Sequence, residues 1–388
     1  MDAVVAGAGE KWSETTSCFG HRRRNRTGSG AASLKNSSIP WDAPRGSLFL
    51  LILLGEGNLL PIFFEIMLNL FWKTHKSILL FKVVNGLLQR EDWDTAIKIP
   101  LGVVPAGTGN GMAKSLLDSV GDPCTITNAV LAIIRGHKRS LDVATITQGE
   151  TRFFSVLMLA WGLVADIDIE SEKYRWMGSA RIDFYALTRI FHLRHYEGCL
   201  YFVPAPGFEA YGETISYPGS SASKRIISDQ MDGESGKLKR LGYQGPEIDL
   251  ENLSWRVLNG PFISVWLHNV PWGAENTKAA PNAEFSDGYL DLIIMKNCPK
   301  LPLLSLMSDL NNGGHVKSPH VMYLKVKVLV LEPGPRRGDQ EKEGIIDADG
   351  EVLARGKGSY QCEQKALMAY DKLQITVDQG LATLFTPI

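Results

Sequence analysis

The sequence is poor in cysteine and has no excess of charge of either sign. Its 388 residues include only five cysteines, and these show neither a CxxC pair nor a zinc-ligand spacing with histidine. This usage argues against a disulfide framework and a zinc site, and it indicates a reducing compartment. Lys plus Arg number 41 against 42 Asp plus Glu, so the net charge is −1. A chain without a basic field is not expected to bind nucleic acid, and any basic site must be local.

Hydrophobic residues make up 44% of the chain and charged residues 21%. This composition supports a sizeable core, and the length predicts two domains. Residues 1–47 differ from the rest because they are small, polar and rich in Gly and Ser, with a basic cluster at residues 21–26. Since they show no apolar periodicity, they predict a disordered leader.

An apolar stretch follows at residues 48–72, and it has two interpretations. Its length is about that of a segment that crosses a bilayer. Glu56 and Glu65 interrupt it, however, and carboxylates are costly at membrane depth. A buried strand, a glycine turn and an apolar helix fit equally well, because a strand buried on both faces is a continuous apolar run. A strand–turn–helix and a membrane-associated segment therefore both stay open.

The rest of the chain divides into an α/β part and a β-rich part. Residues 101–104 predict a short buried strand, which leads through a glycine turn into a helix at residues 112–117. Beyond about residue 141 we expect one strong helix near 169–195 and several strands, at residues 153–160, 262–267, 290–295 and 323–331. The change of rhythm predicts domains at residues 48–140 and 141–388. Residues 206–254, rich in Gly, Ser and charge, predict an exposed insertion.

The glycine turn is suited to holding phosphate. Gly107, Gly109 and Gly111 let backbone N–H groups approach an anion, and the following helix presents unsatisfied N–H groups and a positive dipole end. Thr108 and Asn110 could add side-chain hydrogen bonds. The turn matches neither the lysine-containing P-loop nor the dinucleotide fingerprint. A strand-to-helix turn without a ligand is the alternative.

A second candidate is an acidic and basic segment after Trp161. If it is helical, Asp168, Glu172 and Arg175 fall at i, i+4 and i+7 on one face. A carboxylate on an apolar surface could hold a substrate ammonium, and arginines further along could neutralise a polyphosphate. The alternative is an exposed helix face joined by i,i+4 ion pairs.

Acidic residues also surround a glycine at residues 345–352. Asp347, Asp349 and Glu351 could hold Mg²⁺ directly or through water. The segment lacks the full spacing of a calcium-binding loop. Such a sequence more often forms a hairpin turn, here at Asp349 and Gly350.

Four segments occur together in an order and approximate spacing that one enzyme family shares. They lie at residues 83–88, 105–110, 154–181 and 349–351. The combination resembles the sphingosine kinases, which are diacylglycerol-kinase-like lipid kinases, and the chain looks most like a plant member. The resemblance extends from about residue 82 to near the C-terminus. Its block at residues 154–181 is specific to sphingoid-base kinases, whereas the glycine turn is shared with the wider superfamily.

The resemblance implies an α/β plus β fold: a truncated nucleotide-binding α/β (Rossmann-like) domain and then an antiparallel β-sandwich domain that binds lipid. The implied reaction is phosphorylation of the primary hydroxyl of sphingosine or another sphingoid long-chain base by ATP with Mg²⁺. Positioning and charge neutralisation supply most of the rate of such a transfer. The implied location is cytoplasmic and peripheral to a membrane, such as an endomembrane or the vacuolar membrane, and a homodimer is left open.

Carried over by position, the resemblance implies two sets of site residues. ATP and its phosphates would lie against Gly107, Thr108, Gly109, Asn110, Arg175, Arg181, Asp349, Gly350 and Glu351. Lipid contacts would come from Met158, Leu163, Asp168 and Glu172. Within these sets, Asp168 would accept the amine or hydroxyls of the head group, and Asp349 and Glu351 would also lie near Mg²⁺.

The chain departs from the family pattern upstream of residue 83. The family has a Gly-Asp-Gly turn there, whose Asp is the expected general base, and Ser77 stands at its place. A serine cannot accept a proton as a carboxylate can, so no intact catalytic base is expected. Two accounts follow: a catalytically impaired lipid-binding or regulatory homologue, or a chain whose first ~80 residues derive from an altered transcript, by mis-splicing or misprediction.

Overall fold

The computed structural model describes residues 50–53, 79–105, 107, 109–218, 242–362 and 364–388. The predicted leader, Ser77 and Thr108 lie outside the described residues. So does most of the apolar stretch, of which only residues 50–53 are described, as a strand. In the described part of the chain, no helix has the length and apolar character needed to cross a bilayer.

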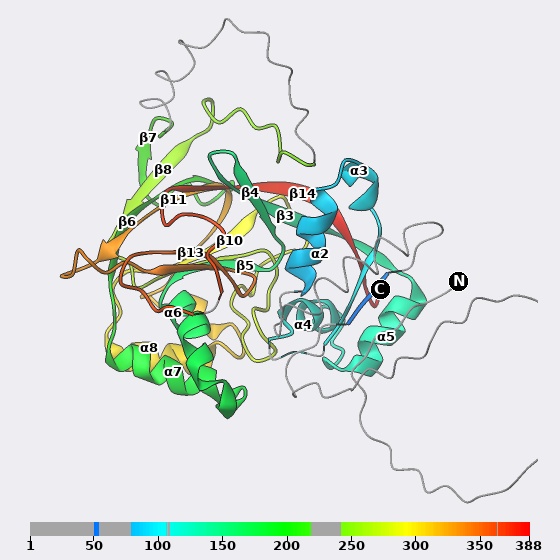
Figure 1. The fold of residues 1–388 in the computed structure, drawn as a ribbon, viewed down its shortest axis with the longest axis horizontal. Helices are drawn as coiled ribbons and strands as arrows, with labels where there is room; N and C mark the ends of the chain where they lie inside the picture. Colours follow the sequence, from blue (N-terminus) through cyan, green and yellow to red (C-terminus); the bar gives the residue numbers. More distant parts are fainter. Residues whose placement is uncertain (1–49, 54–78, 106, 108, 219–241, 363) are drawn as a thin grey trace, which may run out of the picture.

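The elements alternate between helix and strand in the first third of the chain and are mostly strands afterwards (Figure 1). The helices are α2 (Leu79–Leu88), α3 (Trp93–Ala96), α4 (Gly111–Asp118), α5 (Ile126–Arg135), α6 (Leu163–Glu170), the 3₁₀ helix η1 (Ser171–Met177), α7 (Ala180–Phe191), α8 (Lys300–Asp309) and the 3₁₀ helix η3 (Gly314–Lys317). The strands are β1 (Leu50–Leu53), β2 (Leu101–Val104), β3 (Lys138–Gln148), β4 (Thr151–Ser155), β5 (Met158–Gly162), β6 (Tyr196–Pro204), β7 (Glu213–Ile215), β8 (Trp255–Asn259), β9 (Ser264–His268), β10 (Leu290–Met295), β11 (Met322–Arg336), β12 (Ile345–Ala348), β13 (Glu351–Arg355) and β14 (Leu373–Phe385).

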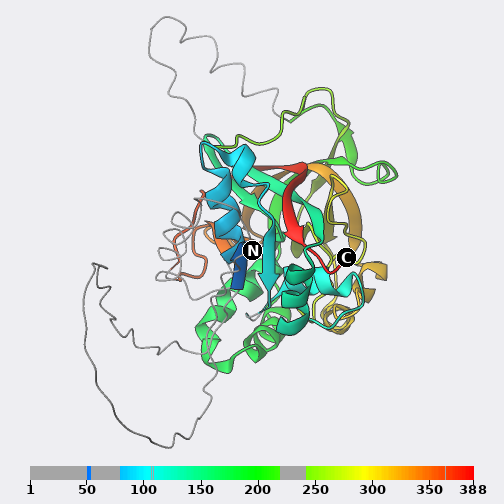
Figure 2. The ribbon, with the colours of Figure 1, turned by 90° about the vertical axis from the view of Figure 1, so that its right-hand side faces the viewer.

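The strands join into one curled sheet, and this confirms the predicted α/β plus β fold class. Its main path runs β1-β2-β14-β11-β10-β9-β5-β12-β13. Among the described strands, the pairing of β14 with β2 is parallel, with Leu384 opposite Leu101, and the other pairings are antiparallel. Figures 1 and 2 both show the end of β14, in red, reaching the N-terminal part of the chain, where its Phe385 packs against Ala129 and Ile133 of α5. The first and last parts of the chain therefore share one sheet.

A common hydrophobic core also joins the two parts. One buried cluster combines Val84 of α2 and Val103 of β2 with Leu141 of β3, Phe154 of β4 and Leu384 of β14. All five side chains are nearly or fully inaccessible to solvent. The short N-terminal α/β part is therefore stabilised by packing against the β-rich part, since burial of apolar surface is the main favourable term in folding.

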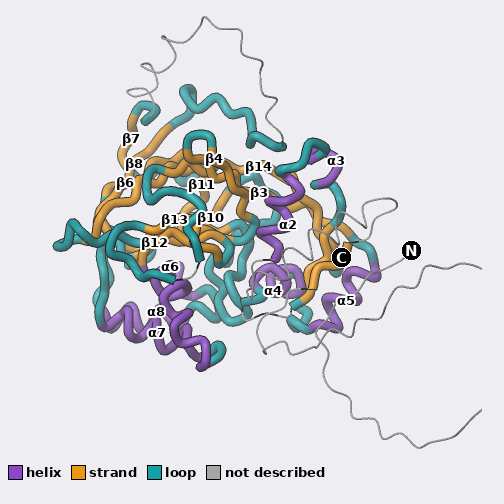
Figure 3. The backbone as a smooth tube through the Cα atoms, viewed as in Figure 1, coloured by secondary structure: helices purple, strands orange, loops and turns teal. Residues whose placement is uncertain are grey.

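Helices α6, α7 and α8 cover one face of β5, β9 and β10 (Figure 3). Ala160, Trp266 and Ile293 point from the three strands into this layer, which we call the helix-covered face. Successive side chains of a strand alternate between faces. Val265 and Leu267 therefore point to the opposite face, into a second buried cluster that also contains Leu292 and Leu324, which we call the barrel-like core. The alternation defines which strand residues can meet the helices.

Two elements differ from their predicted extent. The single helix expected near residues 169–195 is interrupted: α6 ends at Glu170, and the 3₁₀ helix η1 follows. Tyr174 within η1 leaves the helical region (φ −109°, ψ 27°), and Gly178 takes a positive φ of 63° before α7 begins. The single strand expected at residues 153–160 is two strands, β4 and β5, joined by a tight turn. The predicted strand at residues 101–104 and the helix at 112–117 are confirmed as β2 and α4.

Part of the segment 206–254 packs against the core. Residues Glu213–Ile215 form β7, which pairs with β8. Further along, the Tyr243 backbone N–H donates to the Leu88 carbonyl at 2.7 Å. The Tyr243 ring lies 4.4 Å from that of Trp93, and its hydroxyl donates to Asp378. This stretch therefore ties helices α2 and α3 to the C-terminal strand.

Candidate functional site

The side chain of Asn110 forms two hydrogen bonds with the backbone of Gly107 in the glycine turn after β2. The Gly107 N–H donates to Asn110 Oδ1 at 2.9 Å, and Asn110 Nδ2 donates back to the Gly107 carbonyl at 2.8 Å. Asn110 has a left-handed backbone (φ 54°), which Asn tolerates better than most residues. Its buried amide also donates to Glu275 Oε1 at 2.5 Å. These contacts hold Gly107 and Asn110 together directly before α4.

The loop after β9, which belongs to the C-terminal part of the chain, packs over the start of α4. A Cβ atom at Gly111 would lie 2.5 Å from the carbonyl oxygens of both Trp272 and Gly273, so only glycine fits at the start of α4. The Trp272 N–H donates to Ser115 Oγ at 3.0 Å, and its indole donates to Asp118 at 2.9 Å. Sequence reasoning missed this loop. The Trp-Gly pair directly after an apolar strand was the available signal.

Glu172 brings the two predicted phosphate-binding arginines together. Its Oε2 lies 2.7 Å from Arg175 Nε, and its Oε1 lies 2.8 Å from Arg181 Nη2. Arg181 also donates to Ser171 Oγ at 2.8 Å, and that hydroxyl donates to the Asp168 carbonyl at 3.1 Å. Arg175 is 47% exposed, whereas Arg181 is largely covered. The structure therefore makes Arg175 the more accessible guanidinium.

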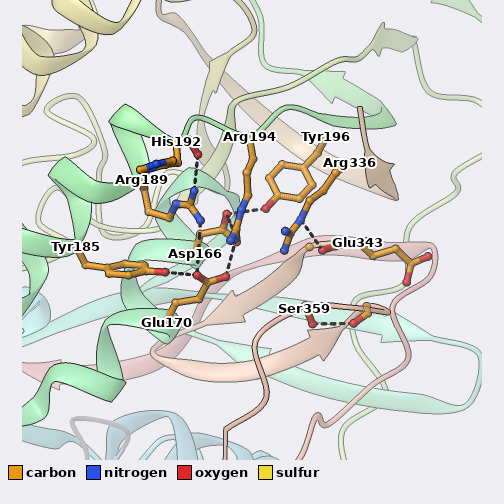
Figure 4. A network of polar contacts seen from close by, with 12 residues as sticks. Asp166, Glu170, Tyr185, Arg189, His192, Arg194, Tyr196, Arg336, Glu343 and Ser359 are labelled. Carbon is orange, nitrogen blue, oxygen red and sulfur yellow. Dashed lines mark hydrogen bonds and ion pairs between the residues drawn. The ribbon is translucent and has the colours of Figure 1, made fainter. Parts of the chain in front are cut away.

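The opposite face of α6 carries a buried charge network (Figure 4). Asp166 and Glu170 both accept from Arg194, at 3.0 and 2.6 Å, and they are only 1% and 3% exposed. Tyr196 donates to Asp166 at 2.6 Å, and Tyr185 donates to Glu170. Because i and i+4 share a helix face, Asp166 and Glu170 point inward together. Glu172 lies beyond α6, in η1, so the predicted single helical face of Asp168, Glu172 and Arg175 does not form.

Burial raises the pKa of Asp166, and the attraction of Arg194 opposes that rise. Burial alone would also raise the pKa of Glu170, but hydrogen bonds from Arg194 and Tyr185 outweigh it and lower the pKa below its usual value. Sequence reasoning missed this network. The signal was present, because four carboxylates recur at every second position from Asp166 to Glu172 in an otherwise apolar segment.

Asp349 organises the turn between β4 and β5. Its carboxylate accepts from the Ser155 hydroxyl at 2.7 Å and from three consecutive backbone N–H groups, those of residues 156–158, at 2.8–3.0 Å. Burial raises the pKa of Asp349, and the N–H donors, those of Val156 and Met158 first, oppose that rise. Asp349 (φ 51°) and Gly350 (φ 85°) form the turn between β12 and β13, as an Asp-Gly hairpin predicts.

Glu351 lies beside Asp349 and is held by two side chains. Lys82 of α2 forms an ion pair with its Oε1 at 3.0 Å, and Gln364 donates to its Oε2 at 3.1 Å. Asp349 uses both of its oxygens on protein donors. Among the described residues, no group of three or more His, Cys, Asp or Glu could hold a metal ion. These carboxylates therefore do not fit a Mg²⁺ site made by the protein alone.

Met158 and Leu163 border the helix-covered face. Met158 Sδ accepts from the Trp266 indole at 3.0 Å, and Leu163 is buried at the start of α6. The predicted site residues thus form three groups: the glycine turn against residues 272–277, the α6–η1–α7 unit, and the β12–β13 hairpin beside α2. Tyr360 of the loop after β13 links the last two, since Lys173 of η1 lies 5.6 Å from its ring.

Comparisons with known proteins identify the family of the chain. The Diacylglycerol kinase catalytic domain family matches residues 79–146, and the YegS C-terminal NAD kinase beta sandwich-like domain matches residues 256–370. The chain is 67% identical over 310 residues to Sphingosine kinase 1 of Arabidopsis thaliana, which covers 80% of this chain and 61% of that protein. It therefore spans about three-fifths of the length of that relative.

Human Sphingosine kinase 1 is 31% identical over 287 residues, covering 71% of this chain and 68% of the human protein. A solved structure, a putative diacylglycerol kinase from Bacillus anthracis, is 16% identical and covers 79% of this chain and 74% of its own, with a TM-score of 0.44. With the two domain matches and the identities to the Arabidopsis and human proteins, the chain belongs to the sphingosine kinase family, of the plant type, within the diacylglycerol-kinase-like superfamily.

Proposed function

We propose that this chain binds ATP and a sphingoid long-chain base, and that its family reaction is transfer of the γ-phosphoryl group to the primary hydroxyl of the base. The observation that carries the proposal is the unit of α6, η1 and α7, which holds Asp168 next to two arginines that one carboxylate orients. Two relatives of the chain, from Arabidopsis thaliana and from human, are named Sphingosine kinase 1.

Arg175 is the group best placed to meet a polyphosphate. Glu172 contacts its guanidinium at Nε, so both terminal nitrogens of the fork stay available to a second anion in the described part of the chain. Planar guanidinium groups match phosphate oxygens in geometry and charge. The glycine turn with Gly107, Gly109 and Asn110 supports the phosphates from the N-terminal part, together with the hairpin at Asp349, Gly350 and Glu351. Mg²⁺ then enters with the nucleotide, held chiefly by its phosphates.

Asp168 is the proposed partner of the lipid head group. It lies in the last turn of α6 (Leu163–Glu170), a helix that packs on the helix-covered face, on which Met158 and Leu163 provide apolar surface. A cationic amine gains from a carboxylate, while the alkyl chain gains from removal from water. Ser77 stands where the family has its Asp base, so binding is the first quantity to measure, and turnover the second.

A paired substitution tests this division of roles. Arg175→Ala is expected to raise the dissociation constant for ATP about 10- to 100-fold, because hydrogen bonds to charged groups contribute about 1.5–3 kcal/mol, and to leave sphingosine affinity unchanged. Asp168→Asn is expected to weaken sphingosine binding and leave ATP affinity unchanged. Calorimetry with each ligand gives both constants. Turnover is measured in parallel with γ-labelled ATP.

Arg337→Ala is the matched control, since Arg337 is 66% exposed and only loosely paired with Glu197 at 3.8 Å. An ATP affinity unaffected by Arg175→Ala would remove that residue from the phosphate site. Binding of both ligands without turnover would identify a lipid-binding homologue in place of an active kinase.

We also infer that the outer side of η1, α7 and α8 lies on a membrane surface. Its exposed large apolar side chains are Trp176, Phe184, Leu187, Phe191 and Leu301. Two contacts join the three elements: the ring of Phe184 in α7 lies 5.2 Å from that of Tyr174 in η1, and Lys300 of α8 donates to the Phe191 carbonyl at 2.8 Å. The exposed Lys173 of η1 and Lys300 of α8 lie on the same elements as this apolar patch and suit anionic lipid.

Removal of the patch tests the membrane contact. Trp176→Ser with Leu301→Ser is expected to weaken binding to phosphatidylcholine–phosphatidylserine vesicles at least tenfold, because Trp176 is 81% and Leu301 80% exposed and each buried large side chain contributes about 1.5–3 kcal/mol. Cosedimentation measures the effect. Ile134→Ser on α5, also an exposed apolar residue, is the control. Equal loss in the control, or none in the double variant, would refute this contact.

A further inference from the structure

Strand β9 places polar side chains on the otherwise apolar helix-covered face. Ser264, Trp266 and His268 share this face, because strand residues alternate and Trp266 packs among the helices while Val265 and Leu267 point into the barrel-like core. His268 lies directly opposite Met158 of β5 in the sheet register. A buried imidazole thus adjoins a proposed lipid-binding residue.

His268 has one nitrogen bonded and one without a partner. The ring is fully buried, and its Nδ1 lies 3.3 Å from the Val270 carbonyl. Since a carbonyl only accepts, Nδ1 carries the hydrogen, and Nε2 is a bare acceptor. Nε2 has no hydrogen-bond partner in the described part of the chain. Burial lowers the pKa of His268 to about 3, against the Val270 contact, so the ring is neutral at physiological pH.

The unpaired nitrogen lies at the border between the two proposed binding sites. A Cβ atom at Gly273 would lie 3.2 Å from His268 Cε1 and 3.7 Å from Nε2. Gly273 is also the residue whose carbonyl covers Gly111, at the start of the helix that follows the glycine turn. His268 therefore lies behind the loop that meets the phosphate-holding turn, with Met158 across the strand pair.

A buried acceptor without a donor destabilises the fold unless a ligand satisfies it. Trp266 packs edge-on against the imidazole, with the ring centroids 4.5 Å apart. Met158, opposite His268 in the sheet register, is a flexible thioether that can adapt its position to a ligand. The group that fits is an uncharged O–H donor carried by a largely apolar molecule.

We propose that His268 is a specificity-determining residue, whose Nε2 accepts a hydrogen bond from a hydroxyl on the carbon chain of the long-chain base, so that bases with an additional chain hydroxyl bind more tightly. The inference rests on the proposed function and deepens it, because it names the substrate class among sphingoid bases. A charged ammonium is assigned to Asp168, which leaves the neutral imidazole for a neutral donor.

The test compares two bases that differ by one hydroxyl, sphinganine and 4-hydroxysphinganine, each presented to the full chain in micelles of the same detergent. Wild type is expected to bind 4-hydroxysphinganine about 5- to 10-fold more tightly, the gain typical of one hydrogen bond. His268→Phe keeps a ring of similar size without the acceptor, and it is expected to abolish the difference while sphinganine affinity stays within about twofold. His268→Gln restores an acceptor near Nε2 and is expected to recover part of the preference.

His137→Phe, at an exposed histidine of the N-terminal part, is the control and should behave as wild type. Equal affinity of wild type for the two bases overturns the inference, as does a preference that survives in His268→Phe. Equal weakening of both bases in both His268 variants would make the residue structural and would also overturn it. If wild type binds neither base, the proposed function itself fails.

Discussion

Arg194→Ala is expected to lower the free energy of unfolding by about 3–5 kcal/mol, the usual loss when one partner of a buried ion pair is removed. Arg194 is the shared donor to Asp166 and Glu170, at 3.0 and 2.6 Å. Without it two buried carboxylates stay behind with Tyr196, Tyr185 and the more distant Arg189 as partners (Figure 4). Urea unfolding followed by tryptophan fluorescence measures the loss.

The same variant has a defined pH dependence. Without Arg194, burial is expected to raise the folded-state pKa of Asp166 and Glu170 above the unfolded values of about 4. A carboxyl group whose pKa is higher in the folded state destabilises the fold as pH rises from the unfolded-state pKa to the folded-state pKa. Below both pKa values it is protonated in both states and has no effect on stability. The deficit relative to wild type should therefore be largest near pH 7 and shrink toward pH 4.

Two further variants make this test specific. Arg337→Ala, which removes an exposed guanidinium, should change stability by no more than about 0.5 kcal/mol. Adding Glu170→Gln to Arg194→Ala should recover part of the loss, since one unpaired charge disappears. A deficit below about 1 kcal/mol that does not depend on pH would show that water solvates these carboxylates.

Asp349→Ala is expected to destabilise the protein by about 4 kcal/mol or more. The change removes the acceptor of four hydrogen bonds, three of them from consecutive backbone N–H groups in the turn between β4 and β5. Each buried donor left unpaired costs about 1–3 kcal/mol. Alanine is also strained at the left-handed backbone of this position, where φ is 51°.

Asp349→Asn separates shape from charge at the same position. Three of the four donors bind Oδ1, and one, the Val156 N–H, binds Oδ2. The asparagine amide keeps an oxygen that can accept from the three donors now bound to Oδ1. Its NH₂ group, however, would face the Val156 N–H, and two donors cannot form a hydrogen bond. We therefore expect the free energy of unfolding to fall by about 1–2 kcal/mol. Asparagine also tolerates the left-handed backbone. Equal losses for Ala and Asn would contradict this assignment of the contacts.

Asp183→Ala, at an exposed carboxylate of α7, is the control for both Asp349 variants. The Asn variant further tests the site. If its ATP affinity matches that of wild type despite lower stability, Asp349 shapes the turn that carries Met158 without contacting the phosphates. A large loss of ATP affinity would support its predicted place beside them.

Elements encoded by neighbouring residues were predicted well. The strand at residues 101–104, the glycine turn and the helix after it depend on local patterns, namely an apolar run, residues that permit unusual backbone angles and a helical repeat. The Asp349–Gly350 turn is local in the same way. Strands β4 and β5 were predicted as one strand, because apolar side chains continue through the turn between them. That turn is held by hydrogen bonds to Asp349, about 190 residues away in the sequence.

The site shows the same division. Asp168, Glu172 and the two arginines were predicted as site residues from the spacing within one segment. The order of the motifs was enough to assign the family. Their partners came from elsewhere: Arg194 meets α6 from beyond α7, Lys82 meets Glu351 across most of the chain, and Trp272 seals the glycine turn. The residue pattern within one segment does not predict which residue of a distant segment will contact it.

The sequence by itself determined the fold class, the family and the chemistry-bearing residue types, because composition, local backbone preference and motif order are properties of the chain alone. Only the tertiary structure decided which carboxylates are buried, which guanidinium stays accessible, and that β14 joins the N-terminal strands to the rest of the sheet. The physical reason is that burial and pairing depend on contacts between distant segments, whose free energies appear only once the chain is compact.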